Sequence, residues 1–530
     1  MIDVSRRAAL ARLGAGMCLL ASRRLAAHPA RAPDHDPASS APFARPLRRP
    51  GSSGLLAELR LARPLELTAR VDVLPVFSGH ATSVWNYAAI IDGRVLNDPL
   101  LIARRGDTID ATLVNQLGQD TTIHWHGLGN DEANDGSGLH PVRHGGRYRY
   151  AFEVRNRAGL YWYHAHPHFR TGDQVHHGLA SLLLVEDAEE LALRERLGIP
   201  WSERDIPLLL ADKQLGRNNE ITYKAGADDW IGNRVLVNWT PEPHLDVHRA
   251  TYRLRIANVS NARMFKLAFV HRGTPLRYRL IGTDGGLLER PFETTQVYLA
   301  PAQRVDLLLD LSALRAGDTV RMRSLAYDPM ENDAAAAGED PMMEHPGAAP
   351  MGARMDLMEF RVTAGPPERT SVPKQLAAPL PDPPRRASVS RSFRIRISDS
   401  GRWMINDWNF LLQPHTHAPA FTVRRGNREV WEFVNEFRSM PHPIHLHGFQ
   451  FRVLERRKSP SQLRALVVAD GGRTAQDMGL LDTVVVWPGE RVRIAIDFAQ
   501  PFRGAQTYML HCHNLEHEDQ GMMVAFAVVD

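Results

Sequence analysis

The sequence predicts an all-β protein made of three antiparallel β-sandwiches in series, and three observations predict it. After residue 55 short segments of alternating apolar and polar residues are separated by Gly, Pro, Asn and Asp, as in strands with one face in a core. A pattern of three strands recurs three times along the chain. The length of 530 residues exceeds one ordinary core and suits about three domains.

Each copy of the repeat has a strand ending in an aliphatic residue and Asn, then a second alternating strand, then an apolar closing strand. The first strands are residues 111–115, 254–258 and 431–435, the second are 148–154, 304–310 and 491–498, and the closing strands are 179–186, 355–362 and 522–529. We therefore expect domains at residues 56–187, 200–365 and 386–530, with linkers near 187–204 and in the Pro-rich stretch 366–386.

The N-terminus is expected to be an export signal. Arg6-Arg7 precedes the short apolar run 13–21 and the small-residue site Ala30-Arg31-Ala32, which resembles a twin-arginine signal over residues 1–32. A disordered basic tail is the alternative. Residues 33–55, rich in Pro, Ala, Ser and Arg, are predicted to be a flexible leader. The expected location is periplasmic or secreted.

Charge gives no support to a nucleic acid partner. The formal net charge is +4, but residues 1–50 hold nine Arg against three Asp, so the rest of the chain is near −2. No later stretch is apolar for long enough to span a bilayer, so we expect a soluble protein without membrane insertion. We also expect a monomer.

Cysteine use points to a metal or a reactive thiol. The chain has two cysteines, Cys18 and Cys512, and removal of the signal would leave Cys512 alone, without an internal disulfide. A lone thiol is either inert and buried, or a ligand or nucleophile. The residues around Cys512 decide between these interpretations.

Four histidine pairs carry the chemistry: His124 and His126, His164 and His166, His445 and His447, and His511 and His513. In a strand, residues two apart point to the same face, so each pair presents two imidazoles side by side. One such pair alone is more often a surface or core feature. Four pairs offer eight nitrogens, too many for one copper and suited to three that share a small oxygen-derived ligand.

The pair around Cys512 contains a second site. If His511 and His513 face one way, Cys512 faces the other, where it can bind a separate metal while bonded covalently to both histidines. His517 follows Cys512 by five residues, Met522 follows it by ten, and His442 lies just before the third histidine pair. A thiolate, two imidazoles and a weak thioether form the ligand set of a blue-copper electron-transfer site.

These motifs resemble the three-domain multicopper oxidases, which include laccases and bacterial copper-efflux oxidases. The resemblance covers residues 55–530 and is carried by HWHG, YWYHAHPH, HPIHLHG and HCHNLEHEDQGMM. It implies three cupredoxin-like Greek-key β-sandwich domains and four copper ions. The blue copper would take His442, Cys512, His517 and Met522, the lone copper of a trinuclear cluster His124 and His445, and the paired coppers His126, His164, His166, His447, His511 and His513.

The resemblance also implies the reaction. A donor would be oxidised one electron at a time, electrons would pass through Cys512 to His511 and His513, and dioxygen would be reduced to water. Asp135 and Glu518 match acidic positions near the cluster and would relay protons. The alternatives are a turn residue for Asp135 and a solvated surface acid for Glu518.

Two electron donors are considered. A phenol or aromatic amine, as in a laccase, is the first expectation, because Arg438 replaces an acidic residue of the copper-efflux branch and repels a cation. Cuprous ion is the alternative, favoured by Met440 and by the methionine-rich stretch 330–358 with Met342, Met343, His345, Met351, Met355 and Met358. A mobile loop with ordinary core methionines is the other interpretation of that stretch.

Other protein classes use part of this ligand set. A copper-storage or copper-carrying protein needs no trinuclear geometry, a copper nitrite reductase does not need all eight histidines, and a scaffold that has lost copper would lack ligands. The full ligand count therefore favours an oxidase over all three.

Overall fold

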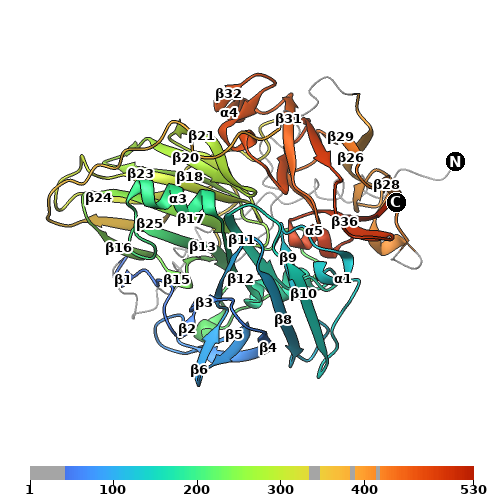
Figure 1. Ribbon diagram of the computed structural model, residues 1–530, viewed down its shortest axis with the longest axis horizontal. Coiled ribbons are helices and arrows are strands. Elements are labelled where there is room, and N and C mark those ends of the chain that lie inside the picture. The colour runs from blue at the N-terminus through green and yellow to red at the C-terminus, as the bar shows by residue number, and fades with distance from the viewer. Residues whose placement is uncertain (1–41, 333–346, 382–387, 414–417) are drawn as a thin grey trace, which may run out of the picture. The chain divides into compact units, whose positions relative to one another are not determined.

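The computed structural model describes residues 42–332, 347–381, 388–413 and 418–530. These residues form three β-sandwiches of two sheets each (Figure 1), which confirms the predicted all-β, cupredoxin-like Greek-key architecture. Helices are few and short. Within the described ranges, none has the length and apolar character that a membrane crossing requires.

The first sandwich is drawn in blue to teal in Figure 1. One sheet has the order β10 (Arg147–Glu153), β8 (Thr108–Asn115), β4 (Leu65–Leu74), β5 (Thr82–Ile91), β6 (Arg94–Asn97), β2 (Gly54–Leu55). The other has the order β3 (Glu58–Arg60), β7 (Leu100–Arg104), β12 (Ala180–Glu186), β11 (Gly159–His164), β9 (His124–His126).

The second sandwich is drawn mainly in green. One sheet has the order β15 (Thr240–Pro241), β14 (Arg234–Val237), β13 (Asp205–Lys213), β17 (Thr251–Asn258), β23 (Arg304–Asp310), β20 (Tyr278–Thr283), β21 (Gly286–Thr294). The other has the order β1 (Arg45–Pro46), β16 (Pro243–Val247), β25 (Met355–Val362), β24 (Thr319–Ser324), β18 (Phe265–His271), β19 (Thr274–Pro275), with β22 (Val297–Leu299) also paired to β18.

The third sandwich is drawn in orange to red. One sheet has the order β27 (Trp403–Ile405), β26 (Arg391–Ile397), β29 (Arg428–Asn435), β35 (Arg491–Asp497), β31 (Phe451–Arg457). The other has the order β28 (Phe421–Arg424), β37 (Met523–Val529), β36 (Gln506–Cys512), β30 (His442–Leu446), β34 (Thr483–Val486). A small ribbon, β32 (Val467–Ala469) with β33 (Arg473–Thr474), lies outside these sheets.

Short helices fill the connections. The described α-helices are α1 (Glu132–Asp135), α2 (Thr171–His177), α3 (Ala188–Leu197), α4 (Ser461–Arg464) and α5 (Leu515–Asp519). Single 3₁₀ turns occur at η1 (Arg217–Asn219), η2 (Phe410–Leu412) and η3 (Ala475–Met478).

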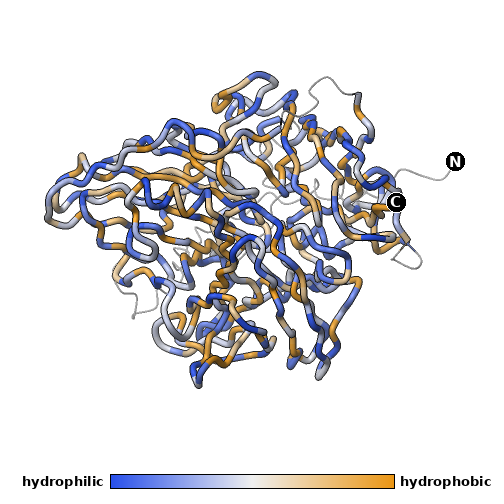
Figure 2. The backbone as a smooth tube through the Cα atoms, viewed as in Figure 1, coloured by the Kyte–Doolittle hydropathy of each residue, from blue (hydrophilic) through white to orange (hydrophobic). Residues whose placement is uncertain are grey.

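Alternation explains why these segments are strands. In β8, Ile109, Ala111 and Leu113 are buried and the intervening side chains are not, so one face of the strand enters the core. Figure 2 shows the resulting alternation of orange and blue along the strands. The three cores contain residues such as Trp125, Phe269 and Trp431, and each fully buried large apolar side chain contributes roughly 1.5–3 kcal/mol.

The predicted repeat is present in the strand pairing. The first and second strands of each copy pair antiparallel: β8 with β10, β17 with β23, and β29 with β35. The closing strands of the copies are β12, β25 and β37. Three similar sequence units therefore give three similar sandwiches.

The segment before residue 56 differs from the prediction. Residues 42–55 were expected to belong to a flexible leader, but β1 pairs in parallel with β16 of the second sandwich and β2 pairs with β6 of the first. Leu47 enters the core of the second sandwich. The Pro- and Arg-rich composition suggested disorder. The segment is ordered because its backbone forms hydrogen bonds with the edge strands of two existing sheets. Residues 1–41, which include the expected signal, lie outside the described residues.

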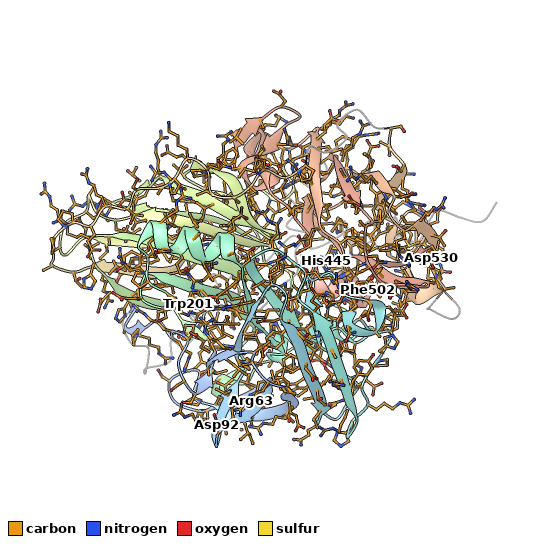
Figure 3. The ribbon with its side chains drawn as sticks, viewed as in Figure 1. Arg63, Asp92, Trp201, His445, Phe502 and Asp530 are labelled. Carbon is orange, nitrogen blue, oxygen red and sulfur yellow. The ribbon has the colours of Figure 1, made fainter. Side chains whose placement is uncertain are left out.

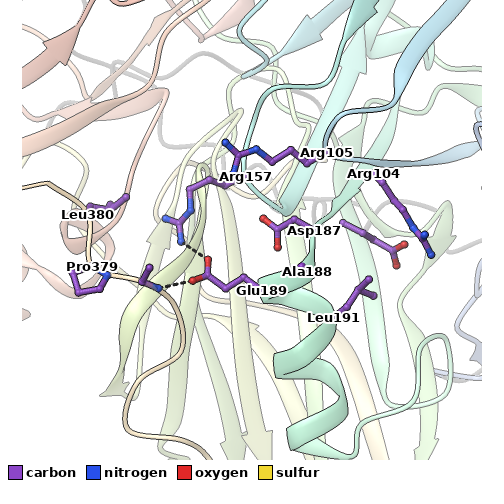
Figure 4. Close-up of a pocket in the computed structure, with 11 residues that line it drawn as sticks. Arg104, Arg105, Arg157, Asp187, Ala188, Glu189, Leu191, Pro379 and Leu380 are labelled. Carbon is purple, nitrogen blue, oxygen red and sulfur yellow. Dashed lines mark hydrogen bonds and ion pairs between the residues drawn. The ribbon is translucent and has the colours of Figure 1, made fainter.

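The two linkers pack against each other. The first, near 187–204, contains α3, whose N-cap Asp187 accepts a hydrogen bond from the backbone of Glu190. Leu193 and Leu197 of α3 share a buried cluster with Leu376 of the second linker. Beside them is a groove of about 690 Å³ (Figure 4). In it, the carboxylate of Glu189 accepts hydrogen bonds from the guanidinium of Arg157 and from the backbone N–H of Ala378. Its lining contains no histidine or cysteine.

Candidate metal centres

The histidine pairs lie on two pairs of adjacent strands or just after their ends. In the first sandwich β9 pairs with β11, which sets His124 opposite His164. In the third sandwich β30 pairs with β36, which sets His445 opposite His511 and leaves Cys512 opposite Ile444. Tight antiparallel pairing of short strands therefore brings histidines that are far apart in sequence into one layer.

All eight histidines meet where the first and third sandwiches face each other, and Figure 3 labels His445 among them. Their exposure is 1% or less. The rings pair across the two sandwiches: His124 stacks on His447 with centroids 4.0 Å apart, and His126 stacks on His445 at 3.8 Å. The remaining rings are close as well, with His166 to His511 at 5.1 Å and His164 to His513 at 5.4 Å.

The hydrogen bonds of these histidines fit metal ligation. Nδ1 of His124 donates to the carbonyl of Asp135 at 2.7 Å, and Nδ1 of His445 donates to the carbonyl of Asp482 at 2.8 Å. Their Nε2 atoms, like that of His164, are buried without a hydrogen-bond partner in the described structure. One nitrogen held by an oxygen and the other left as a bare lone pair is the arrangement of a metal-bound histidine.

Two ring nitrogens even face each other. Nε2 of His447 lies 3.0 Å from Nε2 of His511, while their Nδ1 atoms contact the carboxylate of Asp135 at 2.8 Å and the carbonyl of Cys512 at 3.0 Å. Burial holds the pKa of His447 well below its ordinary value, so its ring is neutral. Two lone pairs at this separation repel each other unless a cation lies between them. The cluster therefore has the donor set that copper needs.

The Cys512 site is a second, separate group. Sγ of Cys512 lies 3.4 Å from Nδ1 of His442 and 3.6 Å from Nδ1 of His517, and the two nitrogens are 3.3 Å apart. Met522 is fully buried in the same core cluster. Burial raises the pKa of the Cys512 thiol, so a bound cation is needed to make it a thiolate.

The two expected proton carriers are buried beside the cluster. Asp135, in α1, is 1% exposed and reaches His447 at 2.8 Å, and burial raises its pKa well above the ordinary value. Glu518, in α5, lies 3.1 Å from Nδ1 of His511 and 3.5 Å from Nε2 of His166. Thr171 donates to Glu518 at 2.6 Å. Glu518 is therefore not a solvated surface acid, and Asp135 stands in the turn that ends at Gly136 but is buried.

Several residues at these centres were not predicted from the sequence. Asp482 lies 3.1 Å from Nε2 of His126 and is held by Arg304 of the second sandwich. The ring of Trp162 stacks on His164 at 4.1 Å, and Trp403 lies 4.4 Å from His517. An isolated Asp or Arg has no characteristic spacing, but Trp162 stands inside the YWYHAHPH motif and is the one that the motif marked.

The methionine-rich stretch divides into parts. Met342, Met343 and His345 lie outside the described residues. Met355 and Met358 belong to β25, and Met358 is a fully buried core residue, as in the ordinary interpretation. Met351 instead lines a cavity of about 20 Å³ together with Met264, Met440 and Asp229. Arg438 is exposed.

Comparison with known proteins agrees with this geometry. Multicopper oxidase family profiles match residues 79–190 and 381–530. A laccase of Bacillus stratosphericus is 32% identical, over 71% of this chain and 72% of its own. A bilirubin oxidase of Albifimbria verrucaria is 30% identical, over 81% and 70% of the two chains.

A solved structure agrees as well. The McoA multicopper oxidase of the hyperthermophile Aquifex aeolicus, as its 2F4 variant, superposes with a TM-score of 0.80 at 32% identity, over 92% of this chain and all of that one. With the motifs, the paired sheets and the buried histidines in agreement, the chain belongs to the multicopper oxidase family of copper-dependent oxidoreductases.

Proposed function

We propose that the chain binds four coppers and couples one-electron oxidation of a small donor to the reduction of dioxygen to water. One copper would take His442, Cys512, His517 and Met522, and the other three would take the eight paired histidines. Domains 56–187 and 386–530 would supply the cluster, and domain 200–365 would complete the assembly. The observation that carries this proposal is a buried histidine layer joined to Cys512 by a single peptide bond on each side.

Copper, when bound, supplies the one-electron chemistry and the reduction of dioxygen. The protein supplies the connection, since Cys512 is covalently bonded to His511 and His513, whose rings belong to the other centre. It also supplies protons: Asp135 and Glu518 contact ligand rings from two different helices, and burial raises the pKa of Asp135 well above its ordinary value.

The cavity beside the Cys512 site favours cuprous ion as a donor. It is bordered by Pro441 and Pro443 on either side of His442, and by Asn514. Three thioethers, of Met264, Met351 and Met440, and the carboxylate of Asp229 line it. Soft thioethers suit cuprous ion, a carboxylate adds charge, and the volume of about 20 Å³ accommodates one ion but no aromatic ring.

The cavity also lies close enough for electron transfer. Asp229 is 3.9 Å from Nε2 of His517 and accepts a hydrogen bond from Asn514, whose amide lies 3.4 Å from the same nitrogen. A donor at Asp229 would therefore sit against a ligand of the Cys512 centre. This geometry makes the cuprous alternative stronger than it was on the sequence alone.

A phenolic or aromatic donor is the second candidate. Relatives include proteins named laccase and bilirubin oxidase, and exposed Arg438 suits an anionic or phenolic donor better than a cation. Against it, His442 and His517 are fully buried, and within the described residues neither presents an exposed ring edge on which an aromatic donor would dock.

Export is proposed from the sequence alone. Residues 1–32 would direct the protein to the periplasm or the outside, where its role as a cuprous oxidase would be copper tolerance. We propose a monomer that acts with dioxygen and its donor and without nucleic acid.

The test compares donors in one buffer. Oxygen uptake and visible absorption are measured for the copper-loaded protein with a stabilised cuprous complex and with a phenol. We expect a blue protein that turns over the cuprous complex faster. Met351→Leu and Met440→Leu should lower cuprous turnover by about tenfold and leave phenol turnover unchanged, since the thioether is lost but the volume is kept.

Met358→Leu is the matched control, because Met358 is a core methionine of β25 away from this cavity. Faster phenol turnover that no methionine variant changes would support the laccase function instead. A blue protein that consumes no oxygen with either donor would contradict the oxidase proposal itself.

A further inference from the structure

Arg304 of the second sandwich contacts all three sandwiches at once. It is the first residue of β23 and is 2% exposed. Its Nε donates to the carbonyl of Leu160 in the first sandwich at 3.0 Å. Its Nη1 and Nη2 donate to the two carboxylate oxygens of Asp482 in the third sandwich at 2.8 and 2.5 Å. The remaining two N–H groups bond the carbonyls of Ala302 and Asp284 at 2.8 and 3.0 Å.

All five donors of this guanidinium are therefore used. Such a buried arrangement is costly to assemble and has one geometry, because each N–H of the planar group has its own acceptor. Gly127 leaves the space for it: a Cβ at this position would lie 2.4 Å from Oδ2 of Asp482 and 2.9 Å from Nη2 of Arg304. The residue after His126 is thus fitted to the ion pair.

Asp482 in turn contacts His126. Its Oδ1 lies 3.1 Å from Nε2 of His126 and also accepts a hydrogen bond from Thr483 at 3.0 Å. Nδ1 of His126 is buried with no partner in the described part of the chain. In His124, His164 and His445 it is Nε2 that lacks a partner, and Nδ1 that bonds a backbone carbonyl. His126 is therefore inverted relative to these three rings.

An inverted ring needs an acceptor in a place where the backbone offers none. The carboxylate of Asp482 provides it, and a buried carboxylate needs a cation and hydrogen bonds of its own. Arg304 provides both. We infer that Arg304 is a positioning residue of the histidine cluster: through Asp482 it holds His126 with Nε2–H on the carboxylate and Nδ1 directed toward bound copper. This inference rests on the proposed copper cluster and makes the middle domain part of the site.

The experiment measures copper binding rather than turnover. Copper affinity of the cluster is determined by competition with a chelator, and electron paramagnetic resonance follows the cluster copper. The blue absorption of the Cys512 centre serves as an internal reference for folding. We expect Arg304→Met to weaken copper retention in the cluster by about 10-fold to 100-fold, with an altered resonance spectrum and unchanged blue absorption.

Two comparisons separate positioning from general destabilisation. Arg255→Met is the matched control, because Arg255 is also buried in the second sandwich and forks to Asp205, but contacts no histidine among the described residues. Asp482→Leu should weaken copper binding like Arg304→Met. The double variant should be no weaker than Asp482→Leu alone, since Arg304 acts through that carboxylate. If Arg304→Met does not fold, Arg304→Lys, which keeps the charge and loses the fork, decides instead.

Wild-type copper affinity and an unchanged resonance spectrum in the Arg304 variants would overturn the inference, as would an equal loss in Arg255→Met. Additive effects of Arg304→Met and Asp482→Leu would also overturn it. Failure of the proposed function is seen earlier and separately, as a wild-type protein that binds a single copper.

Discussion

The two metal centres are built in different ways. The Cys512 site uses His442, Cys512, His517 and Met522, all from the third sandwich, so folding of one sandwich forms it. The histidine cluster takes its residues from the first and third sandwiches, with Arg304 of the second behind Asp482. The first site depends on local packing, whereas the second depends on how whole sandwiches dock. Changes to single ligands and changes to junctions should therefore have separable effects.

The largest effect is expected from Cys512→Ser. Loss of the thiolate should abolish the blue absorption and oxidase turnover, because the alcohol is a poor copper ligand and the copper would no longer be bonded to the residue that joins His511 and His513. The cluster copper should remain bound and visible by electron paramagnetic resonance. Met509→Leu, a buried change on the same strand at a side chain that packs with Phe410 and Met523, is the control. Retained turnover in Cys512→Ser would contradict the assigned electron entry.

Asp135→Asn tests the histidine cluster, which lies at the junction of the first and third sandwiches. The amide keeps the size of the carboxyl but cannot relay a proton, so turnover should fall by about 100-fold while both centres keep their copper and their spectra. Glu132→Gln, on the same short helix α1, should stay near wild type because the amide oxygen still accepts from the backbone of Thr507. Equal rates for Asp135→Asn and wild type would remove Asp135 from the proton path.

The junction between α3 and the second sandwich gives a pH prediction. Burial alone would raise the pKa of Glu190, but Arg255, Arg253 and Arg194 lower it to about 2. Ionised Glu190 thus stabilises the fold above its ordinary pKa of about 4.5, and this is lost as the pH falls through about 2. Glu190→Gln should cost about 3 kcal/mol at pH 7 and progressively less below pH 4.5.

Urea unfolding at several pH values measures this difference, with Glu189→Gln, a neighbour on α3 that is partly exposed, as the control. If Glu190→Gln lowers the free energy of unfolding by the same amount down to pH 2, the negative charge of Glu190 is not what stabilises its contacts with Arg253 and Arg255.

The smallest effect is expected at the edge of the Cys512 centre. Arg438 is exposed, so solvent and salt screen its charge. Arg438→Asp should raise the ratio of cuprous to phenol turnover by only a few-fold, with the effect shrinking at high salt. Arg428→Asp, also exposed and on β29, is the control. An unchanged ratio would show that Arg438 is not part of the donor site.

The sequence was most informative where chemistry has a fixed spacing. Histidines two apart predicted paired imidazoles, and the alternation around Cys512 predicted a thiol on the opposite face, because both predictions need only a locally extended backbone. It was silent on Asp482 and Arg304, since their contacts join residues 178 positions apart and depend on docking. It was also silent on buried Arg253 and Arg255, whose partners come from α3 and β13.

Composition misled at one place and was incomplete at another. Residues 42–55 have the composition of a leader, yet β1 and β2 join existing sheet edges, a long-range effect that local sequence does not encode. The sequence could not tell a core methionine such as Met358 from a cavity methionine such as Met351. The two differ in their tertiary surroundings: Met358 packs in the core of the second sandwich, whereas Met351 lines the cavity beside the Cys512 site.

The most direct test of the account is the stoichiometry of the reaction with a one-electron donor. Oxygen uptake, donor oxidation and hydrogen peroxide are measured together for the copper-loaded protein. If the histidine layer holds three coppers joined to the Cys512 centre, four donors are oxidised for each dioxygen consumed and no peroxide is released. Two donors for each dioxygen, with peroxide accumulating, would contradict a cluster that spans the first and third sandwiches.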